Sequence, residues 1–200
     1  ATKWQLVPGT NRFDCLLGGR WCQQMRILGF FIYLGILTAN AQRYEITTGV
    51  ISFFSEASIE DISAANTHCS GFADLESGKV QFFVKISEFE FERSLMKQHF
   101  NEKYMESALY PMANFSGTIS DVNPSVTTAQ KVSVSGTLTI HGQTKEVMIQ
   151  GLLTRSGSSL KIASTFKVRL VDYNIKIPKL LWQEITDEVE VRVEFDLVSN

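Results

Sequence analysis

The sequence predicts an all-β protein whose strands pair antiparallel in a sandwich or a barrel. Three observations lead to this fold class. Apolar and polar residues alternate along most of residues 43–197, which is the period of a half-buried strand. Short glycine-containing turns separate these segments, and a single segment has helical spacing. Antiparallel strands joined by short hairpins pack as two sheets or close into a barrel.

The clearest strand pattern spans residues 187–197. Apolar residues occupy the odd positions from Val189 to Leu197, and charged residues occupy the even positions between them. This arrangement predicts one buried face and one exposed face. The same period of two predicts strands, in chain order, over residues 43–47, 50–55, 59–65, 68–75, 79–87, 112–120, 131–140, 146–153 and 160–170.

Turn-forming residues join these strands. Hairpins are predicted at residues 76–78, at His141-Gly142 and at residues 155–158, each of which contains a glycine. A longer loop is predicted to begin at residues 121–124. No repeat and no linker composition appears in residues 42–200, so this part of the chain is predicted to form one domain.

One segment, residues 93–108, departs from the strand pattern. It is rich in helix-forming residues, and Leu95, Phe100 and Tyr104 fall near helical spacing. Ser94 is a candidate N-cap, although the capping-box position carries Lys97 rather than Glu. We expect one short helix that lies over one end of the β-structure.

The first 41 residues differ in character from the rest. Met25-Arg26 precede an eleven-residue apolar run, and Ala39 and Ala41 stand at the −3 and −1 positions of a cleavage site. This is the arrangement of a secretory signal peptide. A membrane anchor or a buried helix is less favoured, because the run is too short to span a hydrocarbon core of ~30 Å. We predict an upstream extension over 1–24, a signal peptide over 25–41 and the folded domain over 42–200.

Charge and cysteine content narrow the partners. The chain has 200 residues, with 19 Lys plus Arg and 21 Asp plus Glu. Residues 1–41 hold four of the basic and one of the acidic residues, which leaves a net charge of −5 on residues 42–200. This disfavours nucleic acid as a partner. Cys69 is the one cysteine after the predicted cleavage site, so neither an internal disulfide nor a permanent lipid anchor is expected.

No motif for catalysis, metal or cofactor binding accompanies the strand pattern. His68 and Cys69 are adjacent, so on a strand they point to opposite faces and make a poor zinc pair. The sequence contains no C-x-x-C, H-E-x-x-H, G-x-S-x-G or Gly-rich phosphate loop. Glu88, Glu90 and Glu92 share one face, but such carboxylates are usually solvated. We therefore expect no cofactor, no metal and no enzymatic activity.

Three segments resemble the sequence signatures of one family. Residues 96–117 follow the pattern M-x-x-H-F-N-E-x-Y-x-E-S-x-x-Y-P-x-A-x-F-x-G, residues 136–145 read GTLTIHGQTK, and residues 172–175 read DYNI. Together and in this order they resemble the YceI-like family over about residues 44–198. Two positions depart from the usual pattern: Gln143 replaces an aliphatic residue, and Tyr173 stands where Phe-Gly is common.

The resemblance implies a fold and a ligand class. The fold would be an elongated, lipocalin-like antiparallel β-barrel of about eight strands with the short helix over one end. The ligand would be a long amphiphile, typically a polyisoprenoid or a fatty-acid-like lipid. The resemblance also implies export to the periplasm of a Gram-negative bacterium, and it leaves room for a homodimer.

The apolar strand faces supply the candidate ligand-binding residues. An eight-stranded barrel is just wide enough to be filled by side chains or to hold one slim ligand. These residues therefore either line a tunnel or simply pack a core, and the sequence leaves both readings open. The candidates are Phe53, Phe82, Val84, Ile86, Phe89, Phe115, Leu138, Ile140, Phe166, Val168 and Tyr173.

An amphiphile's head would lie at the barrel mouth, where basic side chains would bind an anionic group. Most such charges on proteins are simply solvated. His141 lies in a predicted turn, where a hydrogen bond within the turn is more expected than catalysis. The candidates for contact with the head are Arg93, Lys97, His141, Lys145 and Arg169.

The favoured function is an exported protein that binds a long-chain amphiphile for transport, storage or stress protection. The alternative is a secreted enzyme or stress-response protein that acts on an isoprenoid-like substrate. A third interpretation is a structural envelope protein with a filled barrel.

Overall fold

The alternating segments of the sequence form the strands of the computed structural model, which describes residues 43–56, 61–123, 125–176 and 187–199. The predicted upstream extension and signal peptide lie outside the described residues. The strands are β1 (Arg43–Ser55), β2 (Ile62–Asn66), β3 (Cys69–Asp74), β4 (Lys79–Lys85), β5 (Glu90–Phe91), β6 (Met112–Ser120), β7 (Gln130–Ile140), β8 (Gln143–Ser156), β9 (Ser159–Arg169) and β10 (Glu188–Ser199).

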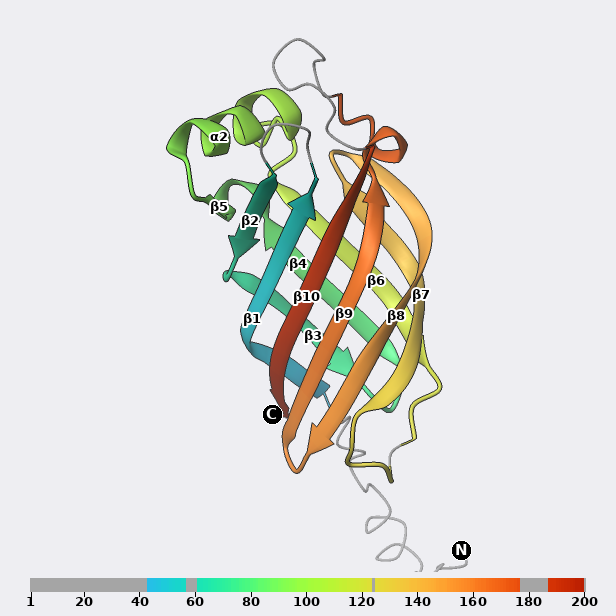
Figure 1. Cartoon of the computed structure of the whole chain (residues 1–200). Coiled ribbons are helices and arrows are strands. Elements are labelled where there is room, and N and C mark those ends of the chain that lie inside the picture. The colour runs from blue at the N-terminus through green and yellow to red at the C-terminus, as the bar shows by residue number, and fades with distance from the viewer. Residues whose placement is uncertain (1–42, 57–60, 124, 177–186, 200) are drawn as a thin grey trace, which may run out of the picture. The chain divides into compact units, whose positions relative to one another are not determined.

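Eight of these strands close into an antiparallel barrel, which confirms the predicted fold class (Figure 1). The order around the barrel is β10-β9-β8-β7-β6-β4-β3-β1, and the pairing of β1 with β10 closes it. The short strand β2 pairs with β1 beyond the end of β3, and β5 pairs with β2. Because side chains alternate across a strand, one face of every strand points into the barrel.

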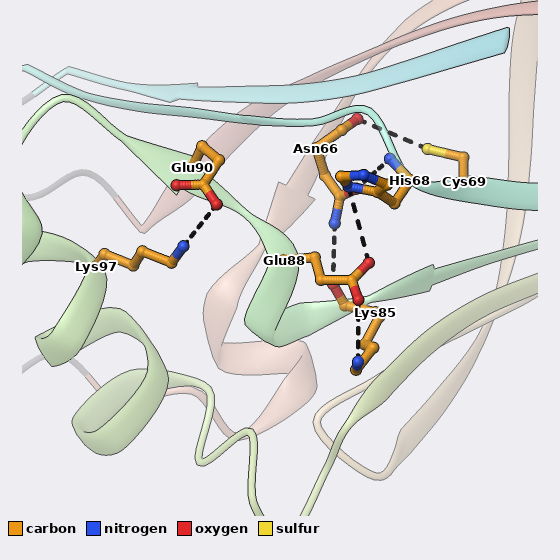
Figure 2. Close-up of polar contacts among 7 residues, drawn as sticks. All are labelled: Asn66, His68, Cys69, Lys85, Glu88, Glu90 and Lys97. Atoms are coloured by element: carbon orange, nitrogen blue, oxygen red, sulfur yellow. Dashed lines mark hydrogen bonds and ion pairs between the residues drawn. The ribbon is translucent and has the colours of Figure 1, made fainter.

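The strands β2 and β3 act as one strand that is interrupted at Thr67-His68. The two halves pair with the same edge of β1. Asn66 closes the interruption: its Nδ2 donates to the Lys85 carbonyl at 2.9 Å, and its Oδ1 accepts from the His68 amide at 2.7 Å (Figure 2). The side chain is fully buried, so these bonds satisfy backbone groups that the interrupted ladder would leave unpaired.

Three strands differ from the sequence expectation in where they begin or end. The expected strands 43–47 and 50–55 form the single strand β1, whose register against β10 shifts between Ile46 and Thr48. The expected strands 79–87 and 160–170 stop earlier. Each is followed by a 3₁₀ turn, η1 (Ile86–Glu88) after β4 and η3 (Leu170–Tyr173) after β9. These turns carry the chain over the end of the barrel.

The predicted helix is present but irregular. The α-helix α2 (Ser94–His99) continues into a π-helical turn, η2 (Phe100–Tyr104). The expected Ser94 cap is wrong: Arg93 holds the extended N-cap backbone without a side-chain cap, and Ser94 is already helical. The wider π turn is closed by a hydrogen bond from the Met105 amide to the Phe100 carbonyl, 2.8 Å long. The segment lies over one end of the barrel, as Figure 1 shows.

Buried side chains fill both ends of the barrel. At the end that carries α2, Met105, Tyr173 and Ile175 join one apolar cluster. At the other end, a second cluster contains four large side chains that are fully buried, Tyr44, Leu153, Leu160 and Leu197. Within the described part of the chain, no helix is long and apolar enough to cross a membrane.

Candidate functional site: an apolar cavity

The barrel contains a cavity of about 230 Å³. Side chains on the inner faces of the barrel strands form its wall, and Phe100 and Met105 from the helical segment extend it. Among the described residues, the lining contains no charged side chain, and its polar members are Asn114 and Ser164. The Ser164 hydroxyl is occupied, because it donates to the Gln150 carbonyl at 2.7 Å. Such a wall offers dispersion and hydrophobic contact but little directional recognition.

Most candidate ligand-binding residues meet at this cavity. Eight of those that do so lie on strands, where the period of two turns them inward, and Ile86 and Phe89 lie in η1 and directly after it. Ten line the wall: Phe53, Phe82, Val84, Ile86, Phe89, Phe115, Leu138, Ile140, Phe166 and Val168.

Tyr173 does not line the cavity. It lies in η3 rather than on a strand, and its ring is buried in the apolar cluster at the end that carries α2. Burial and the neighbouring Asp172 carboxylate raise the pKa of the Tyr173 hydroxyl. Tyr173 therefore packs the end of the barrel.

Four further wall residues come from outside the strands and were not expected from the sequence. Phe100, Met105, Leu170 and Ile175 line the cavity from helical turns or the segment after them. The apolar spacing of residues 93–108 contained part of this signal, but it gave equal weight to Leu95, which is 58% exposed. The π turn, which the spacing does not reveal, is followed directly by Met105.

Two phenylalanine rings occupy space that glycines leave free. Gly49 pairs with Phe195, and Gly71 pairs with Phe82. A Cβ at either glycine would lie 2.7 Å from the Cδ1 atom of the paired ring. The two rings also contact one another, with centroids 4.7 Å apart. The glycines therefore let large rings lie against the wall.

Four phenylalanines pack together at the end of the barrel that carries α2. Phe100 from η2 lies 5.5 Å from Phe53, 5.8 Å from Phe89 and 4.9 Å from Phe91, measured between ring centroids. Tilted and offset ring pairs of this kind are favourable beyond the area they bury. This cluster anchors the helical segment to the barrel.

His141 is a structural link rather than an exposed contact for a ligand head. Its ring is buried, with Nδ1 3.1 Å from the Tyr173 carbonyl and Nε2 3.0 Å from the Glu106 carboxylate. A carbonyl only accepts, so Nδ1 carries a proton. The Tyr110 ring packs edge-on against the imidazole at 4.4 Å between centroids. With both nitrogens occupied, His141 connects the β7–β8 turn to η3 and to the residues after η2.

The other candidates for head contact are spread over two parts of the barrel end. Lys97 on α2 pairs with Glu90, with Nζ and Oε1 2.6 Å apart (Figure 2). Arg93 forms the N-cap of α2. Lys145 on β8 and Arg169 at the end of β9 are exposed. Lys145 pairs in register with the inward-facing Leu138, so it stands on the inner face of β8 near the barrel end.

The surface carboxylates near η1 are paired although they remain exposed. Glu88 contacts the Lys85 ammonium at 2.9 Å and His68 at 3.9 Å (Figure 2). The hydrogen bond from Lys85, followed by the charges of Lys85 and His68, lowers the pKa of Glu88. Exposed pairs of this kind contribute little to stability.

Cys69 is shielded rather than reactive. Burial raises the pKa of its thiol to about 11. Its Sγ lies 3.7 Å from the Asn66 carbonyl (Figure 2). Over the described ranges, no group of three His, Cys, Asp or Glu residues is placed to hold a metal ion.

Comparison with known proteins adds a family and several related structures. The family description "YceI-like domain" matches residues 38–197. A polyisoprenoid-binding domain from Saccharophagus degradans implicated in plant cell wall breakdown superimposes with a TM-score of 0.68 at 15% identity, covering 78% of this chain and 98% of that chain. No curated protein sequence matches the chain.

Two further solved structures have the same fold. Burkholderia cenocepacia BcnA gives a TM-score of 0.59 at 19% identity and covers 76% of this chain and 96% of its own. The Campylobacter jejuni YCEI protein gives 0.60 at 15% identity and covers 72% of this chain and 89% of its own. At these identities, the likeness establishes a common barrel architecture.

Proposed function

This chain belongs to the YceI-like domain family, and we propose that it holds one long aliphatic chain, of a polyisoprenoid or a fatty-acid-like lipid, inside its barrel. The observation that carries the proposal is the cavity inside the barrel, whose wall is apolar. A polyisoprenoid-binding domain with the same architecture supports the ligand class.

The energetics of such a site favour an extended hydrocarbon. Each methylene that leaves water contributes roughly 0.8 kcal/mol. The described wall residues include no charged side chain that an aliphatic ligand would leave unsolvated. Affinity therefore grows with the buried length of the ligand.

The size of the cavity limits the ligand to a single chain. Its volume of about 230 Å³ lies below the roughly 300–1,000 Å³ of typical ligand pockets. A long isoprenoid requires the wall to widen, and the rings of Phe82 and Phe195, which contact one another, are large groups in that wall. We propose that ligand binding moves these rings.

Binding rather than turnover is the proposed activity. No described side chain on the cavity wall can donate or accept a proton in the way a general acid or base must. The most buried histidine, His141, has both ring nitrogens engaged with protein groups. An aliphatic chain in the cavity would therefore meet no acid–base group.

We extend the proposal to export and to a role in transport, storage or stress protection. It is supported by the three-part pattern in residues 25–41. N-terminal sequencing of the protein from cell fractions tests it. We expect the mature chain to begin at Gln42 in a periplasmic or secreted fraction; a mature chain that begins before Gln42 contradicts it.

A series of saturated fatty acids of increasing chain length tests the binding proposal. Titration calorimetry is expected to show dissociation constants that tighten by up to about fourfold per added methylene, and then level off when the chain fills the cavity. An affinity that does not depend on chain length would contradict binding inside the barrel.

A pair of neighbouring substitutions on β9 locates the binding. Phe166→Asp places a carboxylate on the cavity wall, whereas Thr165→Asp places one on the exposed face. A buried carboxylate without a partner is costly, so Phe166→Asp is expected to abolish binding or folding while Thr165→Asp preserves both. Normal folding and binding in Phe166→Asp would show that the ligand lies elsewhere.

A further inference from the structure

The barrel ladder is incomplete between β8 and β9. The β7–β8 pairing extends from Gln130–Leu153 to Ile140–Gln143, and the β9–β10 pairing runs along the whole of β9. The β8–β9 pairing, in contrast, stops at Gly151–Ser164. Residues 143–150 of β8 and 165–169 of β9 therefore have no ladder partner across this junction. Figure 1 shows β8 curving away from β9 toward the end that carries η3.

Specific contacts bound this unpaired stretch, which we call the β8–β9 window. At its lower edge, the Ser164 hydroxyl donates to the Gln150 carbonyl at 2.7 Å. At its upper edge, η3 contacts β8, and the Tyr173 carbonyl accepts from His141 Nδ1 at 3.1 Å. These contacts fix the lower and upper limits of the window. Between them, the facing edges of β8 and β9 are not paired with each other.

The cavity lies directly behind the window. Ile149 on one side and Phe166 and Val168 on the other line the cavity, as do Gly151 and Ser164 at the lower edge. Along this stretch, side chains alone separate the cavity from the outside. A second stretch without ladder pairs separates residues 46–50 of β1 from residues 67–71, but none of these residues is part of the cavity lining.

Buried side chains occupy both ends of the described barrel. Tyr44, Leu153, Leu160 and Leu197 are fully buried at the end opposite α2. The four-phenylalanine cluster, together with Met105 and Ile175, fills the end that carries α2. A ligand that entered along the barrel axis would have to displace one of these clusters.

The outer surface around the window suits an amphiphile. Met148 on the outer face of β8 is 73% exposed, and Val171 in η3 is 58% exposed. Lys145, on the inner face of β8 near the barrel end, and Arg169, at the end of β9, stand on the two strands that flank the window, and both are exposed. An apolar chain and an anionic head would find matching groups at one site.

We propose that the aliphatic chain enters and leaves the cavity sideways through the β8–β9 window, and that its anionic head stays at the rim near Lys145 and Arg169. This inference rests on the proposed binding function and adds the route and the place of the head. Opening requires Ile149, Phe166 and Val168 to move, but it breaks no β8–β9 ladder pair. The β8–β9 hairpin below the window holds the two strands in register meanwhile.

A reversible cross-link across the window tests the route. Cysteines replace Met148 and Lys167, two outward positions that face each other if the register from Gly151–Ser164 is continued, and a short bis-thiosulfonate reagent joins them. Leu152→Cys with Ala163→Cys, an outward pair within the ladder, is the control. The shielded thiol of Cys69 is expected to stay unmodified.

Stopped-flow fluorescence with cis-parinaric acid measures the outcome. We expect the cross-linked window to take up and release the probe at least about tenfold more slowly, with recovery after reduction and no change in the control. Unchanged rates in the cross-linked window would overturn the route and leave the binding proposal intact. Failure of the unmodified protein to bind the probe would overturn the binding proposal, and the route with it.

A second pair of cysteine substitutions tests the same route if the first variant does not fold. Gln150→Cys with Thr165→Cys lies one step above the last ladder pair, on the same outward face. A cross-link between these two cysteines shortens the window at its lower edge and is expected to slow uptake of the probe.

Charge reversal by Lys145→Glu with Arg169→Glu tests the position of the head. We expect weaker binding of the anionic probe and unchanged binding of the matching uncharged alcohol. Equal loss for both ligands would contradict that position.

Discussion

The placement of single aromatic rings determines how much space the barrel keeps. Eleven of the 14 phenylalanines of the chain lie in residues 42–200, and rings of this size would readily fill an eight-stranded barrel. Here Phe195 and Phe82 lie over Gly49 and Gly71, so that part of their bulk takes the place of an absent Cβ. The cavity thus depends on small residues as much as on the apolar ones that line it.

Gly49→Ala tests this dependence. The new Cβ would lie 2.7 Å from Cδ1 of Phe195, which must shift toward the cavity. We expect about tenfold weaker binding of parinaric acid, together with a loss of about 1–3 kcal/mol in the free energy of unfolding. Gly157→Ala is the control for binding: nothing lies within 4 Å of that position, and its φ of 59° strains alanine, so it is expected to lose stability without losing affinity. Undiminished binding in Gly49→Ala would show that the ring position does not limit the cavity.

Cys69 gives a pH dependence with a defined sign. Burial raises the pKa of its thiol from 9.0 to about 11, so folding favours the protonated form. Its contribution to stability is complete below pH 9 and is lost as the pH rises toward 11. Chemical denaturation at several pH values is expected to show a steeper loss over this interval than in Cys69→Ala. Identical pH profiles for the two proteins would contradict the burial of the thiol.

Elements outside the strands complete the site and hold it together. The turns η1, η2 and η3 interrupt the strand and helix patterns near one end of the barrel, and they bring Ile86, Phe100 and Leu170 to the cavity wall. His141 links two of these regions through its contacts with Tyr173 and Glu106. This end of the barrel is therefore held by side-chain contacts more than by a continuous ladder.

His141→Asn separates this linking role from a role in ligand binding. Asparagine tolerates the left-handed backbone at this position, where φ is 50°, but its shorter side chain cannot join both partners. We expect a loss of about 1–3 kcal/mol in the free energy of unfolding with little change in lipid affinity. Unchanged stability with a large loss of affinity would instead place His141 in the binding site.

At the scale of the whole molecule, the sequence predicts which residues line the cavity better than it predicts where a ligand could enter. A period of two assigns each strand residue to a face, so Phe82, Val84 and Phe166 were correctly expected on one apolar face. Tyr173 was misplaced, because the chain leaves the sheet after Arg169 and turns into η3. The β8–β9 window could not be predicted, because an alternating pattern assigns residues to faces and does not show where the pairing of two strands stops. Where their pairing stops depends on the curvature of the closed barrel.

Native mass spectrometry of the protein purified without detergent tests the central claim, that the barrel holds a single aliphatic chain. We expect one added mass per protein in the range of a long-chain lipid, present in the unmodified protein and in Thr165→Asp but absent from folded Phe166→Asp. An unmodified protein that carries no added mass and takes up no lipid when it is offered would contradict the claim.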